Sequence, residues 1–108
     1  MEYKVIWTEP ALVNLREIVE RISRENPSAA KRVGDEIIAH VELLATFPHI
    51  GPHYPRGSKS GDREILCRNY RIFYRVLEQQ HAVEILLLWH GMRQEPELPN
   101  YTGFQAGA

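Results

Sequence analysis

The spacing of hydrophobic residues changes along the chain, and each change marks a predicted element. Between Tyr3 and Trp7 nearly every residue suits a pleated surface, which predicts a short strand. Apolar residues then recur at steps of three and four over residues 8–24 and again over residues 26–47. Thr8 and Asn26 stand where N-cap residues are expected, and Pro48 prevents the second helix from continuing. Because so few residues separate the helices, they should form an antiparallel hairpin.

The second half of the chain is rich in β-branched and aromatic residues. Residues 47–61 contain several Pro and Gly residues without periodicity, which predicts a surface loop. Three strands are expected over residues 63–67, 70–77 and 82–90, with turns at 68–69 and 78–81. The element order therefore predicts an α+β fold of the type β-α-α-β-β-β, with the helical hairpin packed on one face of a small, mainly antiparallel sheet.

We expect one domain over residues 1–95, followed by a C-terminal tail over residues 96–108. A chain of 108 residues can bury one hydrophobic core without disulfides or metals. The tail has no hydrophobic periodicity. It should be either disordered or docked on the domain through Leu98, Tyr101 or Phe104.

The turns fix a strand register, because a shift by one residue would exchange the two faces of a strand. With residues 68–69 and 79–80 as turns, Ile72 lies opposite Ile65 on one side and Leu87 on the other. Tyr74 then lies opposite Ile85, and this face is the one that the helices cover. The other, open face is predicted to carry a charged row (Asp62, Arg75 and Glu84), an apolar middle (Leu66, Phe73, Leu86 and Leu88) and, toward one end, Glu64, Arg71 and His90.

Glu64, Arg71 and His90 are side-chain types that RNA cleavage uses. A carboxylate can activate a 2′-hydroxyl, a guanidinium can stabilise charge on the phosphate oxygens, and a histidine can protonate the leaving oxygen. The alternative is that these residues, like the charged row, are ordinary surface side chains whose cross-strand pairs stabilise the sheet.

The apolar middle of the open face is too large to remain uncovered in a soluble monomer. Two kinds of segment could cover these apolar residues. The tail can dock on it, or a strand or helix of a partner protein can do so.

Composition and charge narrow the function classes. The 13 Lys and Arg residues are balanced by 14 Asp and Glu, so the chain lacks the basic excess with which proteins grip long nucleic acids. Cys67 is the single cysteine, which excludes an internal disulfide and favours a reduced thiol in the cytoplasm. The longest apolar run, residues 85–89, is far too short to span a membrane. His49 and His53 have no acidic residue nearby in sequence, so we expect no metal site, and we expect no cofactor.

Short segments in a fixed order complete the sequence picture. They are Trp7 and residues 11–18, 27–30, 43–51, 63–65, 69–76 and 85–93. Together they resemble the RelE/ParE superfamily of type II toxin–antitoxin toxins from about Tyr3 to Arg93. Three of them look closer to ParE than to RelE: Pro-Xaa-Ala-Ala at 27–30, Phe-Pro-Xaa-Xaa-Gly at 47–51 and Tyr-Arg-Ile-Xaa-Tyr-Arg-Val at 70–76.

The resemblance implies a toxin neutralised by a cognate antitoxin, with three readings of its action. A ParE-like toxin would inhibit DNA gyrase without being an enzyme. A RelE-like toxin would be a ribosome-dependent mRNA endoribonuclease using Arg71, His90 and possibly Glu64, although the last three strands lack the lysines typical of that kind. A non-toxic member would serve only as an interaction module. The antitoxin is expected on the open face, at Leu66, Phe73, Leu86 and Leu88 with a rim of Arg71 and Arg75.

Overall fold

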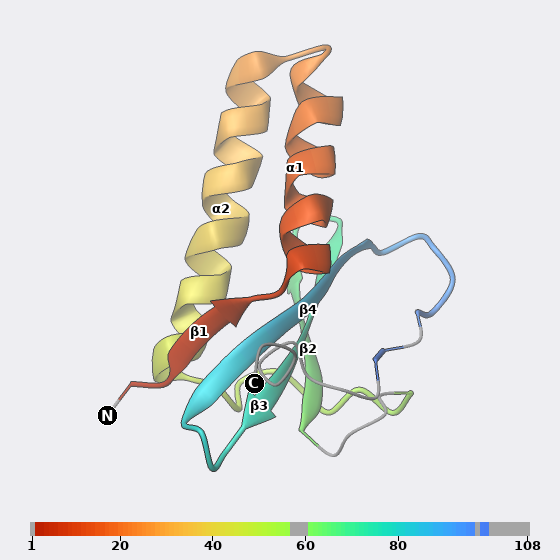
Figure 1. Cartoon of the computed structure of the whole chain (residues 1–108). Helices are drawn as coiled ribbons and strands as arrows, with labels where there is room; N and C mark the ends of the chain where they lie inside the picture. Colours follow the sequence, from red (N-terminus) through yellow and green to blue (C-terminus); the bar gives the residue numbers. More distant parts are fainter. Residues whose placement is uncertain (1, 57–60, 97, 100–108) are drawn as a thin grey trace.

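The computed structural model describes residues 2–56, 61–96, 98 and 99. The elements are β1 (Lys4–Trp7), α1 (Glu9–Ser23), α2 (Pro27–Thr46), β2 (Asp62–Cys67), β3 (Tyr70–Leu77) and β4 (Ala82–His90). α1 and α2 stand side by side as an antiparallel hairpin that projects beyond the sheet (Figure 1). The predicted α+β fold is confirmed, and each strand agrees with its predicted range to within one residue.

Both helices begin directly after the residues predicted to cap them. The Thr8 side chain accepts a hydrogen bond from the Ala11 backbone N–H, and the Asn26 side chain accepts one from the Ala29 N–H at 3.1 Å. α2 ends at Thr46, just before Pro48, as the sequence predicts. The described residues contain no helix long and apolar enough to cross a membrane.

The four strands form one sheet in the order β1-β4-β3-β2. β1 pairs with β4 in parallel, so the first and last strands of the chain are neighbours, and the other pairs are antiparallel. The helices cover one face of this sheet, and the main core lies between them (Figure 1). Its fully buried aliphatic side chains include Ile37, Val41, Leu44, Ile72 and Ile85.

The predicted register is confirmed for β2 and β3 and for the first half of β4. Ile65 lies opposite Ile72, and Tyr74 lies opposite Ile85. For the second half of β4 the predicted register is wrong. A β-bulge between the pairs of Tyr74 and Phe73 shifts the pairing, so that Ile72 lies opposite Leu88. One extra residue in a strand exchanges the faces of everything that follows.

The bulge is stabilised by the start of α1. Thr8 Oγ1 donates a hydrogen bond to the Ile85 carbonyl at 2.6 Å, and Asn14 Oδ1 accepts one from the Leu88 N–H at 3.1 Å. The bulge directs Leu88 into the main core, where it is 3% exposed, so the prediction that Leu88 lies on the open face is wrong.

The face predicted to be open is covered by the chain itself. Phe73 and Leu86 are buried in a second core with Tyr54 from the loop and Leu98 from the tail. Of the four residues predicted to form an exposed apolar middle, Leu66 alone is exposed. Docking of the tail is one of the two predicted covers, and Leu98 is the tail side chain buried in the second core. Tyr101 and Phe104 lie outside the described residues.

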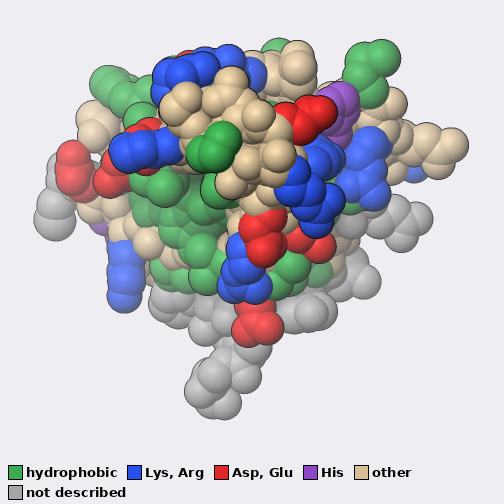
Figure 2. All heavy atoms as spheres, turned by 90° about the horizontal axis from the view of Figure 1, so that it is seen from above, with side chains coloured by type: hydrophobic (Ala, Val, Ile, Leu, Met, Phe, Trp, Pro, Cys, Tyr) green, Lys and Arg blue, Asp and Glu red, His purple; other side chains and the backbone are tan. Residues whose placement is uncertain are grey.

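On the face seen from above the helices, acidic side chains are interspersed with basic ones (Figure 2). Seen from above the helices, both kinds surround an apolar area (Figure 2). This distribution fits the near-neutral net charge of −1.

Candidate functional site

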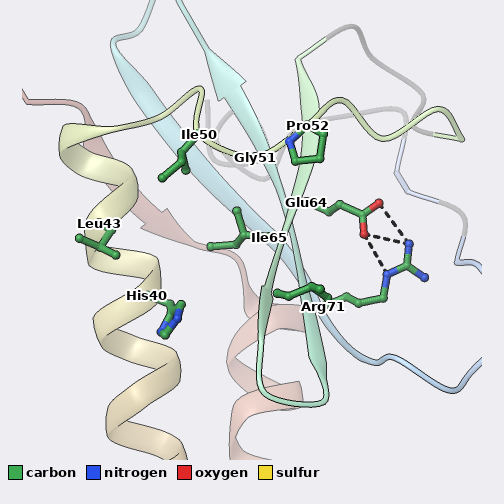
Figure 3. Close-up of a pocket in the computed structure, with 9 residues that line it drawn as sticks. His40, Leu43, Ile50, Gly51, Pro52, Glu64, Ile65 and Arg71 are labelled. Atoms are coloured by element: carbon green, nitrogen blue, oxygen red, sulfur yellow. Dashed lines mark hydrogen bonds and ion pairs between the residues drawn. The ribbon is translucent and has the colours of Figure 1, made fainter.

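Arg71 is the centre of a hydrogen-bonded network on the sheet face away from the helices. Its Nε and Nη2 donate to the two carboxylate oxygens of Glu64 at 2.9 and 3.1 Å (Figure 3). Its Nη1 and Nη2 donate to the two carboxylate oxygens of Glu95 at 2.8 and 3.0 Å. The hydrogen bonds with Glu95, and then those with Glu64, raise the pKa of Arg71 above its usual value despite burial. Two carboxylates therefore already occupy the guanidinium.

Tyr54 closes this network from the loop side. Its hydroxyl oxygen lies 2.9 Å from Glu95 Oε2 and 2.8 Å from the Pro96 carbonyl oxygen. Burial, followed by the hydrogen bond to Glu95, raises the pKa of Tyr54 to about 12. The Tyr54 ring meets Phe73 edge-on at 4.6 Å, and the Arg71 guanidinium lies 4.9 Å from the Phe73 ring centroid. Loop, sheet and tail are thus joined around one arginine.

The charged row of the prediction exists, but it is buried. Asp62 lies opposite Arg75, which lies opposite Glu84, and all three are at most 1% exposed. Arg75 donates to Asp62 at 2.5 and 3.0 Å and to the Pro99 carbonyl oxygen at 2.7 Å. Arg75 therefore does not form the exposed rim that was predicted for an antitoxin.

His90 lies on the opposite face of the sheet from Glu64 and Arg71. The bulge places it opposite Tyr70, and the two rings meet edge-on at 5.6 Å on the side of α1. His90 lines a small pocket of about 90 Å³ with Asn14, Arg21 and other residues. The sequence correctly brings Glu64 and Arg71 together, but the trio with His90 is not assembled.

Exposed apolar side chains gather instead in a groove between α2 and the edge strand β2. Its volume is about 740 Å³. Figure 3 shows side chains that line it. Leu43, Ile50 and Leu66, which line it, are 50%, 60% and 67% exposed. A second hollow of about 320 Å³ shares Leu66 and Arg71 with the groove and continues to Met92, which is 88% exposed. The remaining residues that line the main groove are His40, Gly51, Pro52, Glu64 and Ile65.

Sequence reasoning missed this groove, although a signal for it was present. Leu43 and Ile50 are large apolar residues outside the positions that the predicted core uses. Such residues indicate a surface site only when the fold brings them together. Here α2 and the segment after it lie beside β2, which no local pattern indicates.

Each of the two loop histidines contacts a charged side chain. His49 Nε2 lies 2.6 Å from Glu78 Oε2, although the two residues are far apart in sequence. His53 Nε2 lies 3.2 Å from Arg63 Nη2. Within the described part of the chain, no group of three His, Cys, Asp or Glu residues is placed to hold a metal ion. Cys67 is free and buried, and burial raises the pKa of its thiol.

Comparison with known families identifies the chain. The family of ParE toxins of the type II toxin–antitoxin system parDE matches residues 5–95. The chain belongs to the ParE toxin family. It is also 34% identical over 97 residues to the protein Y4kP of Sinorhizobium fredii, covering 88% of this chain and 95% of that protein.

Solved structures resemble this ParE-family chain in fold. A chain of the chromosomal ParDE system of P. aeruginosa has a TM-score of 0.69 at 22% identity, covering 82% of this chain and 96% of that one. An E. coli RelE toxin mutant in the free state has a TM-score of 0.62 at 19% identity, covering 85% and 86%. A chain of the RelBE2 toxin–antitoxin complex of Mycobacterium tuberculosis has a TM-score of 0.55 at 22% identity, covering 83% and 99%. The ParE and RelE branches thus share this architecture.

Proposed function

We propose that this ParE-family toxin inhibits DNA gyrase in the cytoplasm, without cutting nucleic acid, and that a cognate antitoxin neutralises it. The main observation in favour of gyrase over mRNA cleavage is that His90 is separated from Glu64 and Arg71. A general acid must reach the same substrate as the base and the cation that act with it. Here the sheet lies between them.

The state of Arg71 favours the same choice. A guanidinium that stabilises a phosphate must offer its N–H groups to phosphate oxygens. Arg71 already offers them to Glu64 and Glu95. A phosphate that approached this site would meet two carboxylates first. The match to the ParE family is independent support.

The RelE-like alternative has specific support too, from the TM-score of 0.62 with the E. coli RelE toxin mutant and from the pairing of Glu64 with Arg71. It requires that the tail leave Arg71 and that His90 be dispensable.

A pair of parallel assays distinguishes the two targets. Purified toxin should inhibit supercoiling by gyrase and should leave mRNA intact on programmed ribosomes. His90→Ala and Arg71→Ala should still inhibit gyrase, because neither side chain has a chemical step to perform there. Ribosome-dependent cleavage that is lost in Arg71→Ala, without any effect on supercoiling, would establish the nuclease instead.

We place the antitoxin in the groove between α2 and β2. The ParDE and RelBE2 structures that the chain resembles are of toxin–antitoxin systems, and this groove gathers exposed apolar side chains of Leu43, Ile50 and Leu66. The loop hydrogen-bonds to the outer edge of β2 at Asp62 and Glu64. Beyond Glu64 the edge lies beside the groove, so an extended antitoxin segment can pair with the strand while its apolar side chains enter the groove.

A charge placed in the groove tests this site. Leu66→Asp should weaken binding of the cognate antitoxin by about 2 kcal/mol or more, as for a central interface residue. Leu12→Asp is the matched control, because Leu12 is 43% exposed on α1 and does not line the groove. Titration calorimetry measures both. Equal losses in the two variants, or none in Leu66→Asp, would place the antitoxin elsewhere.

A further inference from the structure

The small pocket at His90 lies between α1 and the end of β4. It is lined by Arg21 and Asn14 of α1, Tyr70 of β3, His90 of β4, and Arg93 just beyond β4. Glu17 is the acidic residue among those that line it. The volume of about 90 Å³ admits a compact group about as large as three water molecules.

The two arginines of this pocket differ in their partners from the arginines of β2 and β3 and of the turn between them. Arg63, Arg68, Arg71 and Arg75 are all engaged by carboxylates or loop carbonyls. Among the described residues, neither Arg21 nor Arg93 forms an ion pair.

Arg21 and Arg93 each make one contact with a neighbouring side chain, and these contacts do not use all of their N–H donors. Arg21 donates to the Tyr70 hydroxyl at 2.7 Å through Nη2 alone. The Arg93 guanidinium lies 4.2 Å from the centroid of the Trp89 ring, and this contact with the ring uses none of its N–H donors.

The hydrogen bonds around the pocket also orient its neutral groups as donors. The Tyr70 hydroxyl oxygen accepts from Arg21, so its own proton remains to be donated. Nδ1 of His90 accepts from the Met92 N–H at 3.2 Å, which places the proton of the neutral ring on Nε2. The Asn14 carbonyl oxygen accepts from the Leu88 N–H, which leaves the amide NH₂ to donate. Five residues therefore offer donors, and one carboxylate offers acceptors.

From this arrangement we propose that the pocket is a binding site for a phosphate group, carried by a nucleotide or by a nucleic-acid backbone. A donor-rich pocket lined by two arginines that form no ion pair within the described part of the chain selects an anion. Its donors come from α1, β3, β4 and the segment after β4, so they converge from several directions. A tetrahedral oxyanion can accept from several directions at once, whereas a flat carboxylate suits a single fork of donors. The site is independent of the proposed action on gyrase.

Titration of the full-length, ¹⁵N-labelled protein tests the proposal. Inorganic phosphate at constant ionic strength should shift the amide resonances of residues 14–21 and 88–93, and acetate should not. A mononucleotide and a single-stranded oligonucleotide are the further arms. If the oligonucleotide binds more tightly than the mononucleotide, the source is a nucleic-acid backbone; the reverse order indicates a free nucleotide.

Variants connect the shifts to the pocket. Arg21→Gln combined with Arg93→Gln should weaken phosphate binding about tenfold or more, because two charge-assisted hydrogen-bond donors are removed. Arg24→Gln is the matched control, because Arg24 is exposed at the end of the same helix and does not line the pocket. His90→Gln should also weaken binding and, because it leaves both arginines in place, should preserve the Arg21–Tyr70 contact.

Three results would overturn the proposal. They are equal shifts with acetate, phosphate binding that the double variant retains while it remains folded by circular dichroism, and an equal loss in Arg24→Gln.

Discussion

At Gly51 the loop packs directly against the sheet without room for a side chain. A Cβ atom there would lie 2.3 Å from the Glu64 carbonyl oxygen and 2.8 Å from both Ile65 Cγ2 and Tyr74 Oη. The Gly51 N–H donates to the buried Tyr74 hydroxyl at 2.9 Å, and the Gly51 carbonyl oxygen accepts from Arg63 at 2.6 Å. Only glycine allows this approach. The position of the loop, and hence one wall of the groove, depends on it.

Gly51→Ala should therefore destabilise the toxin by about 1–3 kcal/mol, because backbone atoms of β2 cannot move aside for the added methyl group. Gly34→Ala provides the comparison. Its Cβ would lie 3.2 Å from a Val19 methyl group, and better helix propensity of up to about 1 kcal/mol offsets that contact. Urea unfolding measures both free energies. A cost for Gly51→Ala no larger than for Gly34→Ala would contradict the reasoning.

At the scale of elements, the start of α1 and the bulge in β4 depend on one another. Thr8 caps the helix and also donates to the carbonyl of Ile85, while Asn14 satisfies the Leu88 N–H. The bulge is what sends Leu88 into the core and His90 toward α1. The contacts between helix and strand thus decide which side chains occupy which face.

Asn14→Ala should destabilise the protein by about 1–3 kcal/mol, because the partly buried Leu88 N–H would lose its acceptor. Asn14→Asp retains an oxygen at the same place and should recover most of this free energy. Thermal unfolding gives the stabilities, and hydrogen exchange at the Leu88 amide reports the local effect. Unchanged exchange in Asn14→Ala would show that the side chain does not hold the bulge.

At the scale of the whole molecule, the tail segment up to Pro99 fastens the second face of the sheet. Glu95 binds Arg71, Leu98 is 6% exposed in the second core, and the Pro99 carbonyl oxygen accepts from Arg75. Trp89 Nε1 donates to the Gln94 carbonyl oxygen at 2.7 Å, so this indole lies where it senses the start of the tail. The tail thereby buries residues that would otherwise form an exposed apolar face.

Docking of the tail should weaken in acid. Hydrogen bonds from Arg71, and then from Tyr54, hold the pKa of Glu95 below its ordinary value. Its ionised form therefore favours the docked tail, and this contribution is lost as the pH falls through the lowered pKa. Trp89 fluorescence, recorded in a Trp7→Phe background, should change over that acid range.

Glu95→Gln supplies the control for this titration. The variant should show weaker docking at neutral pH and no corresponding acid transition. The same transition in Glu95→Gln would assign the change to another group.

The amino-acid sequence by itself determined the elements, the caps of both helices and the register from Asp62 to Ile85. Each of these depends on residues close together in the chain, through hydrophobic period, capping side chains and tight turns. It also brought Glu64 and Arg71 to one face, because the two-residue turn at 68–69 admits one register.

Only the tertiary structure decided the rest of the site. The run from Ile85 to Trp89 is apolar throughout, so its pattern does not reveal a bulge, and the side of His90 depends on contacts with α1. The tail has no periodicity of its own, and it is positioned by Arg71, Arg75 and the second core. The groove forms because α2 and the loop lie beside β2. These contacts join residues distant in sequence, and their free energy appears only when the chain has folded.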